Sequence, residues 1–180
     1  DALVARLKDP NLSSFERSQI IDALARAGRV DAVIAMMKEA ATAEPNNPDR
    51  TVDVALALLS KLRNGKVSQM AQATLGMAAD KALDQALALD NEHWDARFNK
   101  AISLSFWPPV MGKQPEAISH FETLIEQQGR GAPQPHHAQT HLWLGNLYQQ
   151  SGKSEMAQQT WAAGLALFPD SDELQKRLNQ

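Results

Sequence analysis

The sequence contains no cysteine, which excludes disulfide bonds, thiolate metal sites and a cysteine nucleophile. It also lacks a strong excess of charge, with 18 basic and 21 acidic residues and a formal net charge of -3. Nucleic-acid-binding proteins normally carry a basic surface, so we expect no nucleic-acid partner. No apolar run reaches the roughly 18 residues that a membrane-spanning helix needs, and we expect no direct membrane insertion by this segment.

Sequence motifs of catalysis are also missing. There is no GxSxG nucleophile turn and no GxGxxG dinucleotide motif. Gly112-Lys113 lacks both the upstream glycine and the following Ser or Thr of a phosphate-binding loop. The acidic residues are scattered along expected helix surfaces, where carboxylates are normally solvated. The sequence therefore predicts a protein that is not an enzyme and that needs no cofactor.

The sequence leaves the compartment open. A chain without cysteine suits the cytoplasm and the periplasm equally well. The chain begins at Asp1 rather than at a methionine, which predicts a processed protein or part of a longer or anchored one.

Strand signals are scarce, whereas strong helix formers dominate the sequence. Gly, Pro and Asn residues divide it into segments of helix length, and Ser13 with Glu16 forms a capping box at one start. The expected helices cover residues 1–8, 13–28, 30–43, 48–63, 67–89, 94–105, 115–128, 136–150 and 154–167, with a terminal helix at 170–179. About ten helices with short connections predict an all-α fold of stacked helical hairpins, an α–α superhelix.

An internal repeat is clearest over residues 138–171. Its characteristic residues are, in order, Leu144, Gly145, Tyr148, Ala157, Trp161, Gly164 and Pro169. Small residues let two antiparallel helices approach closely, and the aromatic residues fill the space beside them. This order resembles the tetratricopeptide-repeat consensus, whose period is about 34 residues. His141 departs from it, because the family usually carries tryptophan there.

Fainter copies of the pattern extend the resemblance over most of residues 14–171. We expect a single domain over 1–180, with repeats at about 14–47, 48–93, 94–130 and 138–171 and the terminal helix after them. In the third repeat the two helices are separated by a longer loop, Phe106–Gln114.

The resemblance implies a function in protein binding. In such repeats the first helix of each pair lines a concave face. Mapped onto this sequence, the exposed concave positions are Asp95, Phe98, Asn99, Ile102, Gln139, Leu142, Trp143 and Asn146. The resemblance therefore implies a scaffold or adaptor that holds a partner peptide or helix there, in the assembly or maturation of a larger complex.

A competing interpretation concerns the same helix. Leu142, Trp143 and Leu147 make it apolar nearly all round, and such a helix is normally covered on both sides. Another helix of the same chain, rather than a partner, could cover Trp143. Phe98 and Leu142 also stand where a clamp for a peptide carboxylate would need polar or basic groups, which argues against such a clamp.

The Phe106–Gly112 loop is unusually apolar for a connection. Phe106, Trp107 and Met111 are its candidate contact residues. The loop either folds back onto its own hairpin or meets a partner. Self-association of two copies through this loop, giving a homo-oligomer, is therefore an alternative function.

His137 and His141 are four residues apart and share a helix face, as paired zinc ligands often do. Ala138 stands where a zinc protease would carry Glu, and a third ligand would have to come from elsewhere, with His120 as the candidate. Metal binding through His137 and His141 is a further alternative, although our expectation is that there is no metal site.

Overall fold

The computed structural model of this protein describes residues 2–7, 9 and 12–179. Within these ranges it contains ten α-helices, two short 3-10 helices and no β-strand. The expected all-α fold class is therefore confirmed. Both ends of the first expected helix, Asp1 and Lys8, lie outside the described residues, as does Pro10 after it.

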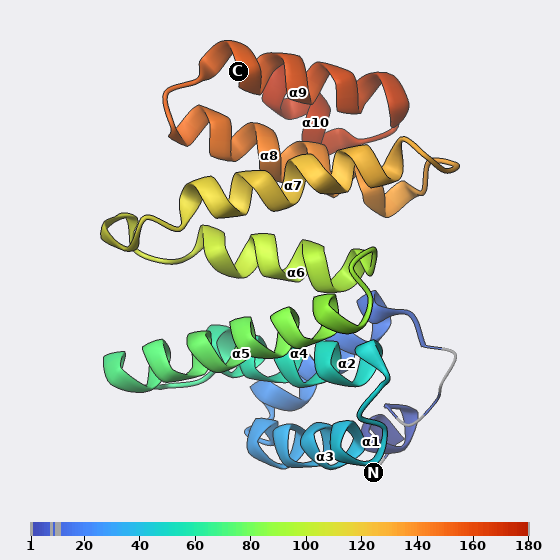
Figure 1. Cartoon of the computed structure of the whole chain (residues 1–180), viewed down its shortest axis with the longest axis vertical. Helices are drawn as coiled ribbons and strands as arrows, with labels where there is room; N and C mark the ends of the chain where they lie inside the picture. Colours follow the sequence, from blue (N-terminus) through green and yellow to red (C-terminus); the bar gives the residue numbers. More distant parts are fainter. Residues whose placement is uncertain (1, 8, 10–11, 180) are drawn as a thin grey trace. The chain divides into compact units, whose positions relative to one another are not determined.

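The chain divides into two compact units, Asp1–Asn99 and Lys100–Gln180, with the boundary inside one helix (Figure 1). The first unit contains α1 (Ala2–Arg6), α2 (Ser14–Arg26), α3 (Val30–Ala43), α4 (Pro48–Asn64), α5 (Gln69–Leu89) and the start of α6 (Trp94–Ser105). The second contains the rest of α6, η1 (Pro109–Met111), α7 (Gln114–Gln128), η2 (Pro135–His137), α8 (Ala138–Gln150), α9 (Ser154–Leu167) and α10 (Asp172–Leu178). The single domain and its repeat boundaries stay predictions.

Local chemistry at the helix ends explains why the expected boundaries agree with the structure. The capping box is present: the Glu16 N–H donates to Ser13 Oγ at 3.2 Å, and the Ser13 N–H donates to the Glu16 carboxylate at 3.1 Å. Gly28 and Gly152, which follow α2 and α8, both have a φ of 74°. This left-handed backbone ends a helix without strain only at glycine.

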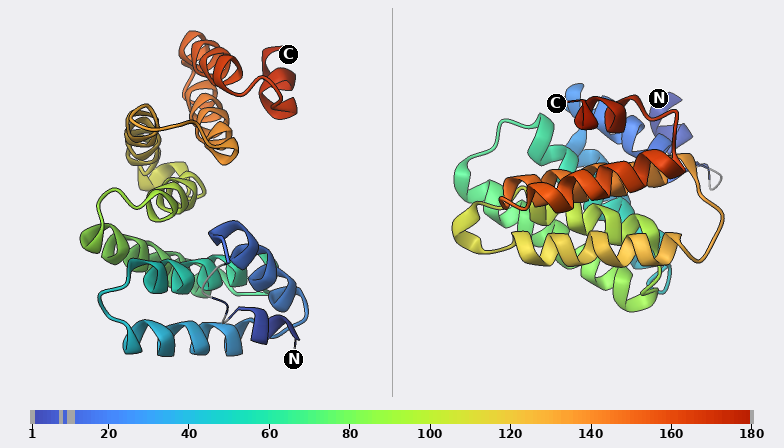
Figure 2. Two further views of the ribbon diagram at one scale, coloured as in Figure 1. Left: turned by 90° about the vertical axis from the view of Figure 1, so that its right-hand side faces the viewer. Right: turned by 90° about the horizontal axis from the view of Figure 1, so that it is seen from above.

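The core of the first unit is built around α4, which packs against α2, α3 and α5 (Figure 2). Every residue of α4 from Val52 to Ser60 is buried. A helix that is covered on all sides needs apolar or paired residues all round. Asp53 is the charged residue in this buried stretch, and its partner is therefore important for the stability of the unit.

That partner is Arg17 of α2. The Arg17 Nε lies 3.1 Å from Asp53 Oδ1, and both side chains are almost fully buried. The guanidinium also donates to the backbone carbonyls of Leu7, at 3.1 Å, and Leu12, at 3.4 Å. Arg50 lies 3.7 Å from the second carboxylate oxygen. Burial raises the pKa of Asp53 to about 6, because the loss of water outweighs the attraction of the two arginines.

In the second unit the α8–α9 hairpin confirms the close approach expected from the small residues of the repeat. A Cβ atom added at Gly145 would lie 2.7 Å from Trp161 Cε2 and closer still to two other atoms of the indole. A Cβ added at Gly164 would lie 2.5 Å from the Cβ of His141. The indole N–H of Trp161 donates to the Leu142 carbonyl at 3.3 Å. The Trp161 ring is therefore fixed over a helix that has no side chain at the crossing point.

The α7–α8 contact is held by a polar pair as well as by packing. The Tyr148 hydroxyl donates to Glu122 at 2.5 Å. Burial, followed by the hydrogen bond and the negative charge of Glu122, raises the pKa of Tyr148. The phenol therefore remains a hydrogen-bond donor at neutral pH, and α7 is joined to the hairpin that follows it.

Candidate functional site

Trp143 lies on α8 and is half-buried. Its ring meets Phe106 edge to face, with 6.0 Å between the ring centroids and 66° between the planes. Phe106 itself is 73% exposed. Trp143 is therefore only partly covered by its own chain. The exposed ring of Phe106 extends the apolar surface beside it into solvent.

Leu142 and Asn146 are four residues apart on α8, and Trp143 is three residues before Asn146, so the three lie on adjacent positions of one helix surface. Leu142 and Asn146 are both half-buried. The Asn146 Oδ1 atom is buried and has no hydrogen-bond partner among the described residues. We refer to Phe106, Leu142, Trp143 and Asn146 as the α8 patch. It combines exposed aromatic surface with one unsatisfied acceptor.

Two other residues of α8 are engaged within the unit. Leu147 is 2% exposed, so the chain itself covers this part of the apolar helix. Gln139 donates to Glu173 of α10 at 2.5 Å. The competing interpretation, in which the chain covers its own helix, therefore holds for Leu147. Leu142 and Trp143 are only partly covered.

The expected positions at the start of α6 belong to the first unit. Phe98 stacks on Trp94, with ring centroids 4.6 Å apart and planes 11° apart. Asp95 accepts a hydrogen bond from the Ser14 hydroxyl at 2.6 Å, and the Asn99 side chain donates to the Asp95 carbonyl at 2.8 Å. Ile102, in the second unit, is half-buried. A single concave surface that joins all eight expected positions stays a prediction.

The Phe106–Gly112 loop does not bury its apolar side chains. Val110 is 91% exposed and Met111 is 52% exposed, whereas Trp107 is half-buried. The exposed side chains of Phe106, Val110 and Met111 make this loop a candidate contact surface.

The two histidines of the metal hypothesis have different environments. His141 is 4% exposed and packs against Gly164. His137 is half-buried, and its Nδ1 accepts the backbone N–H of Gln134 at 3.3 Å. Burial is the main cause that lowers the pKa of both rings. Over the described ranges, no three His, Asp or Glu side chains form a group that could hold a metal ion.

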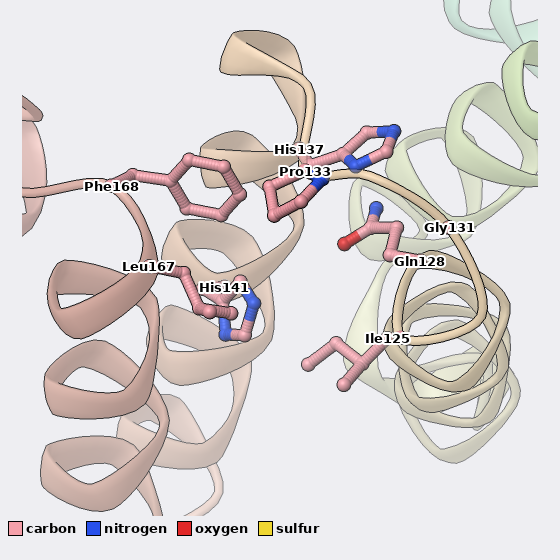
Figure 3. Close-up of a pocket in the computed structure, with 9 residues that line it drawn as sticks. Ile125, Gln128, Gly131, Pro133, His137, His141, Leu167 and Phe168 are labelled. Atoms are coloured by element: carbon pink, nitrogen blue, oxygen red, sulfur yellow. The ribbon is translucent and has the colours of Figure 1, made fainter.

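A pocket in the second unit has no counterpart among the sequence predictions (Figure 3). It has a volume of about 230 Å³ and lies between the end of α7, the linker 129–134, α8 and the end of α9. His137 and His141 line it, together with Gln128 and Phe168, which sequence analysis did not single out. The signal that could have indicated it is the Gly- and Pro-rich linker directly before two histidines.

Solved structures with a similar fold are tetratricopeptide-repeat (TPR) proteins. TTC0263, a thermophilic TPR protein of Thermus thermophilus, aligns with a TM-score of 0.71 and 13% identity, covering 98% of this chain and 85% of that one. YrrB, a TPR protein with an unusual peptide-binding site, aligns with a TM-score of 0.48 and 17% identity, covering 100% and 99%. MamA aligns with a TM-score of 0.43 and 20% identity, covering 84% and 92%.

No protein-family model matches the sequence, and no curated protein is detectably similar to it. The alignment with TTC0263 and the close α8–α9 packing around Gly145 and Gly164 agree with each other. The chain therefore has the TPR fold, as its resemblance to the repeat consensus predicted. None of the helices in the described ranges combines the length and the apolar character needed to span a bilayer.

Proposed function

We propose that this protein is a protein-interaction module and that the α8 patch holds a peptide or helix of a partner. The observation that supports this most directly is the Phe106–Trp143 pair, in which one ring is half-buried and the other is 73% exposed. Aromatic residues that are anchored at one edge and open at the other are typical centres of binding energy in interfaces.

The partner's chemistry follows from the patch. Phe106, Leu142 and Trp143 offer apolar surface without a charged group, which suits apolar side chains of the partner. The Asn146 side chain is half-buried beside these residues, and its Oδ1 atom is buried without a hydrogen-bond partner among the described residues. Participation in the assembly or maturation of a larger complex is part of the same proposal.

Phe106→Ala and Trp143→Ala should each weaken binding of a peptide selected from a random library on the wild-type chain. A central aromatic residue of an interface contributes about 2 kcal/mol or more, which is roughly a thirty-fold change in Kd. Phe106→Ala should leave thermal stability nearly unchanged, because the ring is mostly exposed. Isothermal titration calorimetry and thermal denaturation measure the two effects.

Phe15 provides a matched control. It lies on α2 in the first unit and is 72% exposed, almost the same fraction as Phe106. Phe15→Ala removes the same side chain from a comparable environment and should leave the Kd unchanged. Equal losses of affinity in Phe15→Ala and Phe106→Ala would exclude the α8 patch as the binding surface. An unchanged Kd in both Phe106→Ala and Trp143→Ala would exclude it as well.

The exposed loop supports a second candidate, self-association. Val110 and Met111 expose apolar surface that a second copy of the chain could cover. Sedimentation velocity over a concentration series distinguishes the two candidates. Self-association predicts a concentration-dependent dimer that Val110→Asp abolishes, whereas a monomer at all concentrations excludes it.

A further inference from the structure

None of the described residues that line the pocket between α7, α8 and α9 is an Asp, Glu, Lys or Arg (Figure 3). Ile125, Pro133, Leu167 and Phe168 supply apolar surface. Burial lowers the pKa of both histidine rings, which favours their neutral forms. A volume of about 230 Å³ is below the roughly 300–1,000 Å³ of pockets that hold drug-sized ligands. The pocket therefore suits a neutral group about as large as one aromatic side chain.

Two buried polar atoms that line this pocket have no hydrogen-bond partner among the residues that the structure describes. His141 is 4% exposed and its Nδ1 is unsatisfied. The ring makes a hydrogen bond to the Thr160 backbone that raises its pKa, so the ring is the donor there. A neutral imidazole has one N–H, and with that N–H engaged, Nδ1 is left as an acceptor.

Gln128 shows the same pattern. Its Nε2 donates to the Thr140 hydroxyl at 2.7 Å, and its Oε1 is buried without a partner. Both unsatisfied atoms are thus acceptors, and leaving a buried acceptor unsatisfied is unfavourable. A ligand that donates a hydrogen bond and accepts none complements the pocket.

We propose that this pocket receives the indole ring of a tryptophan on a partner polypeptide. Indole is flat, apolar and uncharged, and its N–H is a donor without any acceptor atom. A tyrosine hydroxyl would bring its own acceptor oxygen toward two further acceptors. A pocket of this size gives weak binding by itself, so the remaining affinity has to come from the chain that carries the tryptophan.

The acceptor atoms are shielded from water, so a donor that reaches them meets no competition from solvent. The linker 129–134 contributes Gly129, Gly131 and Pro133 to the pocket wall, and both glycines are exposed. His141 and Trp143 are two residues apart, about 200° around a helix of 3.6 residues per turn. The pocket therefore lies on the opposite side of α8 from Trp143, and this proposal stands independently of the α8 patch.

The test uses an acetylated and amidated Gly-Gly-Trp-Gly-Gly peptide titrated into the whole chain and followed by amide NMR shifts. We expect saturable shifts confined to residues around the pocket, with a millimolar Kd. The same peptide with tryptophan methylated at the indole nitrogen should bind at least about fivefold more weakly, because the donor is gone. A phenylalanine peptide should show a similar loss.

Gln128→Met removes one acceptor at nearly constant side-chain length and should weaken the tryptophan peptide several-fold. Gln158→Met is the matched control, because Gln158 is exposed on α9 and does not line the pocket. If Gln128→Met fails to fold, the affinities of the wild-type chain for the unmethylated and the methylated tryptophan peptides still test the proposal. Equal affinity of the methylated peptide, shifts spread over the surface, or saturation by free indole but not by the peptide would each overturn the proposal.

Discussion

Gly145→Ala is expected to lower the free energy of unfolding by about 1–3 kcal/mol, and Gly145→Leu by more. Helix propensity alone predicts the opposite, since alanine is favoured over glycine by about 1 kcal/mol in a helix. Packing wins here because the added Cβ would lie 2.7 Å from Trp161 Cε2, and the indole is buried and hydrogen-bonded to the Leu142 carbonyl. Urea denaturation followed by far-ultraviolet circular dichroism measures the change.

Gly129 is the matched control for this substitution. It follows α7 with a φ of -65°, and an added Cβ would meet only backbone oxygens at 3.5 and 3.6 Å, an ordinary contact. Gly129→Ala should therefore be neutral or slightly stabilising. Trp161→Phe should cost less in the Gly145→Ala background than in the wild type, because the smaller ring makes room for the methyl group. A stabilising Gly145→Ala would show that the two helices do not approach as closely as we describe.

The fold was predictable from the sequence because its signals are local. Ser13 and Glu16 set the start of α2 through contacts three residues apart, and Gly152 ends α8 through its own backbone conformation. Gly145 and Trp161 could also be paired in advance, because the repeat consensus fixes which positions of two neighbouring helices meet. Each of these signals lies within one hairpin.

The candidate site was predictable only in part. The order of residues on α8 indicated that Leu142 and Trp143 lie off the packing face, but not that Phe106 would rest against the indole while Leu147 is covered. The pocket depends on Gln128 and Phe168, which are brought together by three helices and a linker. No periodicity of a single helix carries that information, since it arises from tertiary packing.

The ion pair of the first unit was missed for the same reason. Arg17 and Asp53 lie on different helices, and each looks like an ordinary surface charge in its own segment. A charge at position 53 needs a partner because α4 is buried on all sides, and this burial becomes evident only in the folded structure.

Arg17→Met should therefore be strongly destabilising at pH 7, by about 3–5 kcal/mol, because it leaves the Asp53 carboxylate buried without its nearest positive charge. It also removes the donors to the Leu7 and Leu12 carbonyls. Arg63→Met is the control, since its ion pair with Asp22 is considerably more exposed and should contribute about 1 kcal/mol or less. Urea denaturation of the two variants gives both values.

The pH dependence of the free energy of unfolding tests whether the charge of Asp53 causes the destabilisation in Arg17→Met. Its pKa is about 6 in the folded chain and about 3.9 when unfolded. Between these values the folded state holds a proton that the unfolded state releases, so the free energy of unfolding falls as the pH rises through 6. Relative to Asp53→Asn, which cannot titrate, the free energy of unfolding of the wild type should rise by about 1 kcal/mol when the pH is lowered from 7 to 5.

In Arg17→Met the Asp53 carboxyl keeps its proton to a higher pH than in the wild type. The stability that this variant loses relative to the wild type should therefore be smaller at pH 5 than at pH 7. A loss that is the same at both pH values would mean that Arg17 stabilises the unit through Leu7 and Leu12 rather than through the charge of Asp53.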